Sequence, residues 1–472
     1  MRGYAQTTGP TRKTRKQEGP AGLDVVHPNA AGIDVGSGEM WVCVPAGRAP
    51  ERVRRFGTVT SQLQAIADWL HACGVETVAM ESTGVYWIAL FQILESRGFA
   101  VYLVNARHVK NVPGRRKTDR LDCQWLQKLH ACGLLRASFR PTDRVCALRS
   151  LLRQRDTLIR MASRHIQHMQ KALREMNVLL DQVTTDITGT TGMRIIDAIL
   201  GGCRDYAQMA RLRDPRLHAS EEQIAEALRG DYRPEHLFVL KQALAAYRFV
   251  WEQIQQLDAE VEQTLNALVQ HAGKSAVALP EAGLTGCEKR RGNAPDYDVQ
   301  TYLYRLTGVD LTRIPGLAAA AIQSLISETG VDMSRWPTEK HFASWLGLAP
   351  DPKISGGQII GQTRRHVQSR AARVLRVGAM TLRRSPTWLG AFYRRIKARA
   401  GGAMAITATA HKLAVIYYTM LRTNQEYRAL SAIDYEQRFQ ERMLRNLKRR
   451  AKQCGFELVA VAPSGPVVNS AN

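Results

Sequence analysis

Short apolar runs alternate with segments of helical periodicity over residues 30–135, and this alternation constrains the fold more than any other feature. Three apolar runs come first, a helical segment follows, and strand and helix then alternate to the end of the region. The expected strands are 30–34, 40–44, 54–59, 76–80 and 100–105, and the expected helices are 61–73, 84–96 and 117–131. This succession predicts a mixed sheet flanked by helices.

Four acidic residues stand at the ends of these expected elements. Asp34 ends an apolar strand and precedes a glycine turn, and Glu81 directly follows another strand. Asp119 and Asp122 lie three residues apart at the start of a helix, and so on one face of it. Each of them alone could be a turn residue or a helix cap. Together they can converge on one point, where cations would have to offset their mutual repulsion.

Carboxylate oxygens are hard ligands, which suit Mg²⁺ or Mn²⁺. Two such ions about 3.5–4 Å apart can activate a nucleophile and stabilise a leaving oxygen. The four acids therefore predict a metal site that cuts or joins nucleic acid. A rival reading starts from the run GIDVGS, which resembles the first phosphate loop of the sugar-kinase, actin and chaperone ATPase superfamily. We find neither the second phosphate loop nor the adenosine loop of that superfamily.

The charge of the chain points to a polyanionic partner. Its 472 residues include 66 Lys and Arg against 42 Asp and Glu, a net charge of +24, which favours DNA or RNA. No acidic residue occurs between Asp351 and Glu426, whereas solvated helix faces usually mix both signs. The candidate nucleic-acid contacts in this basic segment are Arg364, Arg365, Arg370, Arg373, Arg376, Arg383 and Arg384.

Composition narrows the class of protein further. Apolar content of 45% with 23% charged residues is that of a globular chain, and the length favours two or three domains. No apolar run reaches the 18 residues of a spanning helix, and the polar, basic N-terminus is not a signal peptide. The eight scattered cysteines form no zinc-ligand pattern and indicate a reducing compartment. We therefore expect a cytoplasmic protein with no membrane partner.

The middle of the chain is expected to be helical. Residues 144–180 are amphipathic, whereas 181–235 and 271–305 look irregular. Residues 237–270 space their apolar side chains at three and four, which is typical either of a coiled coil between subunits or of one long helix packed inside a domain. Further on, an Ile-Pro-Gly-Leu turn in 310–330 resembles a helix-hairpin-helix, although any tight helical hairpin could need that turn.

Two separate sets of motifs stand out in the sequence. The first set comprises GIDVGSGEMWV, ESTGVYW and NARHVKNVPGRRKTDRLDCQWL, and the second IPGLAAAAIQSLISETG, FASWLGLAPDPKISGG and RAARVLRVGAM. Both sets, which cover about residues 28–180 and 306–425, resemble one family, the DEDD transposases of the one-ten family of insertion sequences. The resemblance implies an α/β RNase H-like N-terminal domain similar to Holliday-junction resolvases, with Asp34, Glu81, Asp119 and Asp122 as its metal-binding acids.

The resemblance also singles out Ser355, which follows GLAPDPKI and precedes two glycines. From the residues alone it is a loop serine, but the family carries a nucleophilic serine in this position, and a serine that attacks a phosphodiester conserves the bond energy for rejoining. Thr363 and Ser369 are the alternative hydroxyls. The family also implies a structured guide RNA that pairs with donor and target DNA.

These observations predict five regions. They are a disordered basic arm (1–27), the RNase H-like domain (28–140), a helical linker with coiled coil and insertions (141–305), a mostly α-helical transposase domain (306–430) and a basic extension (431–472). The expected activity is DNA transposition or recombination, in a homo-oligomer such as a dimer or tetramer. The alternatives are a metal-dependent, structure-specific DNA nuclease that uses water, and a non-catalytic nucleic-acid scaffold.

Overall fold

The computed structural model divides into two compact units, Met1–Arg140 and Pro141–Asn472. The expected N-terminal arm lies almost wholly outside the described residues, as do Arg364 and Arg365. The structure describes residues 24–82, 84–105, 118–273, 280, 292–363, 367, 369–429 and 431–459.

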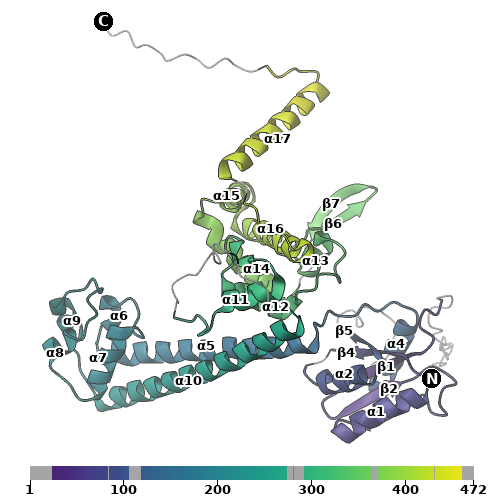
Figure 1. Cartoon of the computed structure of the whole chain (residues 1–472), viewed down its shortest axis with the longest axis horizontal. Helices are drawn as coiled ribbons and strands as arrows, with labels where there is room; N and C mark the ends of the chain where they lie inside the picture. Colours follow the sequence, from purple (N-terminus) through teal and green to yellow (C-terminus); the bar gives the residue numbers. More distant parts are fainter. Residues whose placement is uncertain are drawn as a thin grey trace, which may run out of the picture. The chain divides into compact units, whose positions relative to one another are not determined.

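The first unit is built on a five-stranded mixed sheet (Figure 1). Its strands are β1 (Ala30–Val35), β2 (Glu39–Cys43), β3 (Val53–Gly57), β4 (Thr77–Glu81) and β5 (Ala100–Val104), in the order β3-β2-β1-β4-β5. The first three strands pair antiparallel, whereas β4 and β5 run parallel to β1. A short turn joins β1 to β2 and a longer loop, residues 44–52, joins β2 to β3, whereas the parallel strands need helical crossovers. The expected α/β class and its succession of elements are confirmed.

Helices cover both faces of this sheet. Helices α1 (Thr60–Ala72) and α2 (Trp87–Ser96) pack on the face that carries Ile33, Val78 and Met80. Helix α4 (Asp119–Ala131) covers the opposite face and packs on β1, β2 and β4. Because side chains alternate between faces along a strand, Gly32, Ala79 and the residues two positions away from each on the same strand face α4.

A buried histidine marks one end of the packing of α4 on the sheet. His130 is fully buried, and its Nε2 lies 2.8 Å from the hydroxyl of Thr77, which donates to the carbonyl oxygen of Ala100. That hydroxyl can therefore only accept a hydrogen from Nε2, and the other ring nitrogen has no partner among the described residues. Burial, and secondarily the nearby His27, lowers the pKa of His130 to about 4.

We expect the first unit to lose stability as the pH falls below about 6.5. An unfolded histidine has a pKa near 6.5, so between about pH 6.5 and 4 the unfolded chain binds a proton that the folded one excludes, which lowers the unfolding free energy by up to about 3 kcal/mol. Urea unfolding of wild type and His130→Leu at pH 7.5 and pH 5 measures this, with exposed His218→Leu as the control. An undiminished pH dependence in His130→Leu would contradict the assignment.

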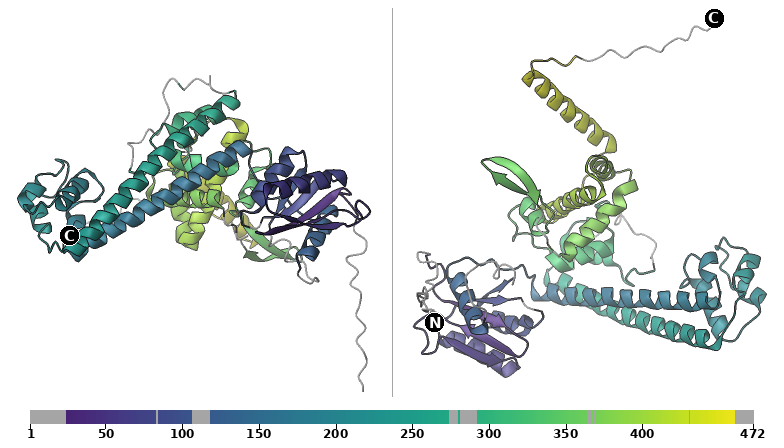
Figure 2. Two further views of the ribbon diagram at one scale, coloured as in Figure 1. Left: turned by 90° about the horizontal axis from the view of Figure 1, so that it is seen from below. Right: turned by 180° about the vertical axis from the view of Figure 1, so that it is seen from behind.

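Two long helices that lie side by side form the stem of the second unit (Figures 1 and 2). They are α5 (Asp143–Glu175) and α10 (Pro234–His271). The apolar stripe of α10, including Leu244, Ile254 and Val261, is buried, and its first half packs in one core with α5. Just outside that core, buried Arg155 of α5 donates two hydrogen bonds, of 2.5 and 3.0 Å, to the carboxylate of buried Asp258 of α10. The stripe that suggested a coiled coil thus pairs within the chain.

The segment between these long helices is more ordered than its composition suggested. Residues 181–235, expected to be irregular, form short helices around a shared core with the ends of α5 and α10. These helices are α6 (Leu180–Val183), α7 (Thr190–Leu200), α8 (Tyr206–Ala210) and α9 (Glu221–Ala227). The frequent turn formers lie between and at the ends of the helices, as Ser220 does when it caps α9.

The C-terminal part of the second unit is mainly helical. It contains α11 (Val299–Thr307), η1 (Leu311–Arg313), α12 (Ala319–Thr329), α13 (Glu339–Trp345), α14 (Arg370–Thr381), η2 (Leu382–Arg384), α15 (Trp388–Ala400), α16 (Gly402–Thr423) and α17 (Ala432–Gln453). The expected Pro-Gly turn connects η1 to α12. A Cβ on Gly316 would stand 2.7 Å from the carbonyl oxygen of Gly378 in α14, so close helix packing explains this turn.

A two-stranded hairpin interrupts these helices. Strands β6 (Asp351–Ser355) and β7 (Gln358–Thr363) pair antiparallel, and Ser355 stands opposite Gln358. Gly356 and Gly357 both have positive φ, as the type I′ two-residue hairpin turn requires. Within the described residues, no helix is both long and apolar enough to cross a membrane.

Candidate active site

The carboxyl ends of β1 and β4 carry two of the expected acids next to each other. The parallel register pairs Ile33 with Met80, so Asp34 and Glu81 follow at neighbouring positions. Adjacent strands lie about 4.8 Å apart. Asp34 is two residues after Gly32 and Glu81 is two residues after Ala79, so both acids are on the face of the sheet that α4 covers. Glu81 is buried and Asp34 half-buried.

Helix α4 brings the other two acids to the same edge because it runs opposite to β1. Its Gln127 donates to the carbonyl oxygen of Ala30 near the start of β1, and His130 meets Thr77 at the start of β4. The beginning of the helix must therefore lie toward the ends of both strands. There Thr118 caps the helix by accepting from the Leu121 amide, and Asp119 and Asp122 occupy the first turn.

The close approach of α4 depends on the absence of a side chain at Gly32. A Cβ at this position would lie 2.3 Å from the amide nitrogen of Gln127 and 2.4 Å from the carbonyl oxygen of Cys123. The Cys123 thiol donates to the carbonyl oxygen of Arg120. The neighbouring Cys43 thiol, burial and, to a smaller extent, the negative charge of Asp34 raise the pKa of Cys123, so Asp34 lies near the first half of α4.

The donor set fits a divalent cation, although the side chains are not gathered around one point. The four carboxylates share one edge and one face of the sheet, and they offer only hard oxygen ligands. Among the residues that the structure describes, no three acidic, histidine or cysteine side chains lie close enough together to hold a metal ion. Asp119 is exposed, so its side chain has room to adjust, whereas Asp122 is half-buried.

Ser355 occupies a different setting, in the second unit. It is the last residue of β6, it is exposed, and it directly precedes the glycine turn of the hairpin. Exposed Ile354 and Ile360 accompany it on the hairpin. Of the alternative hydroxyls, Ser369 caps α14 by accepting from the Ala372 amide, which gives it a structural task.

The expected arginine contacts divide into two groups. Arg370 forms an ion pair with Asp156 of α5 and lies 3.9 Å from Glu328, so its charge is already balanced. Of the others that the structure describes, Arg376 is half-buried and the exposed ones are Arg373, Arg383 and Arg384. These exposed arginines remain available for phosphate contacts.

The sequence interpretation missed the hairpin that carries Ser355. The sequence predicts only a loop there, although Gly356-Gly357 is a dipeptide typical of a two-residue hairpin turn. It also gave no role to Glu328, which Arg149 and Arg153 contact at the C-terminal end of α12. Only the fold shows that these residues meet, because about 175 positions separate them in the chain.

A mixed sheet with acidic side chains at one edge of its central strands defines an RNase H-like domain, the class expected for phosphodiester chemistry. Two family models match the chain: the DEDD transposases of the IS110 type over residues 31–178, and the transposases of the IS116/IS110/IS902 family over residues 310–394. The chain therefore belongs to the IS110-type transposases and is a DNA transposase/recombinase. No curated protein matches it significantly.

Proposed function

We propose that this transposase cuts and rejoins DNA through a composite site, in which Asp34, Glu81, Asp119 and Asp122 bind metal and Ser355 is the nucleophile. The metal-binding part of this proposal is supported by one observation: the ends of β1 and β4 and the start of α4 lie at the same edge and on the same face of the sheet. When bound there, Mg²⁺ or Mn²⁺ would polarise the scissile phosphate and stabilise the leaving oxygen.

The chemistry of Ser355 is a phosphoryl transfer that conserves one ester bond. Its Oγ attacks phosphorus, the bond from phosphorus to the leaving strand oxygen breaks, and the hydroxyl proton ends on that oxygen. The product is a phosphoserine ester, which a strand hydroxyl can attack in reverse to rejoin DNA. Exposure at a hairpin turn supports this role, because the hydroxyl must reach a backbone phosphate.

The two halves of the proposed site lie in different units of the chain. The site must be completed either by both units of one chain or by units of two copies. We propose that the protein is a homo-oligomer in which units of two copies complete it. The arginines Arg373, Arg376, Arg383 and Arg384 would hold DNA, with Arg364 and Arg365 beside them in sequence. A structured guide RNA would choose the target by base pairing, as the family suggests.

Hydrolysis by water is the second candidate reaction. The same acids could serve a structure-specific nuclease, in which the metal site activates water and Ser355 takes no part. The two reactions differ in one product, since only serine attack leaves protein covalently joined to DNA.

A nicked suicide substrate, which lets the leaving strand diffuse away, distinguishes the two reactions. With Mg²⁺, we expect wild type to accumulate a protein–DNA adduct and Ser355→Ala to form none. Ser369→Ala, which removes a hydroxyl from the same domain, should still form it after allowance for a lost helix cap of about 1 kcal/mol. Adduct formation by Ser355→Ala would exclude this serine, and cleavage by wild type without any adduct would favour the nuclease.

A further inference from the structure

The second half of α17 carries a row of basic side chains on one face. Arg442, Arg445, Arg449 and Lys452 follow one another at spacings of three, four and three residues, which places them along one side of a helix. Lys448 lies on the same side, and all five are exposed. Within the described part of the chain, the ion pairs observed include none of these five residues.

The first half of α17 is fixed to α15, so the basic row is held in place by a packed neighbour. The guanidinium of Arg395 lies 3.8 Å from the ring centre of Phe439 and 4.8 Å from that of Tyr435. Its Nη1 is also 3.5 Å from Glu436, and the Trp388 ring packs on Tyr435. These contacts anchor one end of the helix and leave the basic side chains out of its packing.

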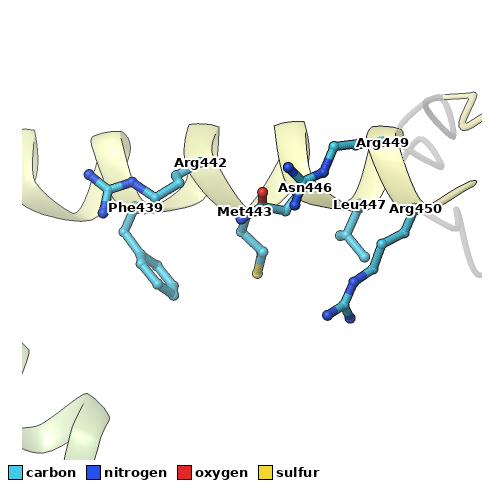
Figure 3. A pocket seen from close by; sticks show the side chains of 7 residues that line it. All are labelled: Phe439, Arg442, Met443, Asn446, Leu447, Arg449 and Arg450. Carbon is cyan, nitrogen blue, oxygen red and sulfur yellow. The ribbon is translucent and has the colours of Figure 1, made fainter. Parts of the chain in front are cut away.

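Apolar side chains gather on the other side of α17. Phe439, Met443 and Leu447 recur at intervals of four residues and line a shallow hollow along the helix, which Arg442, Asn446, Arg449 and Arg450 also border. In Figure 3 the three apolar side chains project to the same side, away from Arg442 and Arg449. Arg450 projects to this apolar side, whereas Arg442 and Arg449 of the basic row project to another side of the helix.

The dimensions of the basic row suit a DNA duplex. Ten residues of helix rise about 15 Å, and duplex DNA carries about one negative charge per 1.7 Å of its axis. The major groove of B-form DNA is about 12 Å wide and admits an α-helix, whereas the major groove of duplex RNA is too narrow. A straight basic helix thus complements DNA in both charge and shape.

We propose that α17 is an additional DNA-binding element, which lies along a duplex and contacts phosphates through Arg442, Arg445, Arg449 and Lys452. The helix lies beyond both segments that the transposase family models match, the second of which ends at residue 394. The inference rests on DNA as the substrate of this enzyme and is independent of serine attack.

Equilibrium binding of the full chain to a 30-base-pair duplex, measured in EDTA so that no chemistry occurs, tests the proposal. The test variant replaces Arg442, Arg445, Arg449 and Lys452 by glutamine, which is as good a helix former. The charge-matched control replaces four exposed basic residues by glutamine: Arg164 and Lys171 of α5, Arg229 just after α9, and Lys241 of α10. A third chain, Met443→Gln with Leu447→Gln, alters the apolar side of α17 alone.

We expect the test variant to bind the duplex on the order of 100-fold more weakly near 0.1 M salt. The plot of log affinity against log salt concentration should become shallower, its slope falling in magnitude by about 3 to 4. The control and apolar variants should stay within about threefold of wild type. Equal weakening in the control, or in binding to a duplex RNA of the same sequence, would overturn the proposal. Unchanged DNA binding with lost binding to anionic phospholipid vesicles would also overturn it, and would assign the helix to a membrane surface.

Discussion

Asp34→Asn is expected to lower the rate of DNA strand cleavage on the order of 1000-fold while the chain stays folded. The substitution keeps the size of the side chain but removes the charge that a divalent cation needs, and the metal contributes several kcal/mol of transition-state stabilisation. Because Glu81 is the neighbour of Asp34 across the parallel register, Glu81→Gln should have a similar effect. Single-turnover cleavage at saturating Mg²⁺ measures both rates.

The matched control for Asp34→Asn is Asp68→Asn. Asp68 lies on α1, on the other side of the sheet, and makes an exposed ion pair with Arg97. Such pairs contribute little to stability, so cleavage should remain near the wild-type rate. If Asp34→Asn cleaved at the wild-type rate, the acidic edge would not be the metal site, and the scaffold interpretation would gain support.

Gly32→Val is expected to destabilise the first unit by about 3 kcal/mol or more and to abolish cleavage as well. Even the Cβ of alanine would overlap backbone atoms of Gln127 and Cys123, and backbone cannot move without moving α4. Overpacking of a well-packed core typically costs about 1–3 kcal/mol and occasionally more, and here the added atoms meet backbone. Asp119 and Asp122 begin the same helix, so displacement of α4 disturbs the acidic edge too.

Amide hydrogen exchange of α4 in the full chain measures the effect of Gly32→Val, since local opening of this helix should become more frequent. Gly38→Ala is the control, because a Cβ there would meet no atom within 4 Å. Unchanged protection of α4 in Gly32→Val would show that the helix does not sit against β1 as described.

The strands and helices of the first unit could be predicted from the sequence because each has a clear period and a clear end. The acids could be predicted as a group for the same reason, since Asp34 and Glu81 end strands and Asp119 starts a helix. The side of the sheet on which they lie could not be predicted. It depends on the register of β1 and β4 and on the direction of α4, which contacts far apart in the chain decide.

Two features of the second unit show where periodicity is insufficient. The stripe of 237–270 was compatible with a partner helix from another subunit or from the same chain, and only the fold identifies α5 as the helix it packs against. Ser355 was assigned by family resemblance, because a serine beside two glycines has no distinctive pattern. Its place in a hairpin could have been inferred from the turn, but its proposed role could not.

A mixture of two inactive chains would show how the proposed site is assembled. Asp34→Asn supplies an intact Ser355, and Ser355→Ala supplies intact acids. Recovery of cleavage on mixing would mean that units from different copies complete one site, as a homo-oligomer allows. Absence of recovery, with each chain still binding DNA, would assign the site to the two units of a single chain.

The most direct test of the composite site is the amount of Ser355–DNA adduct formed by Asp34→Asn alone. If the acids and the serine act on the same phosphate, this chain should form almost no adduct with the suicide substrate, although its serine is intact. An adduct at Ser355 that forms at the wild-type rate in Asp34→Asn would contradict the account, because the serine would then react without the acidic edge.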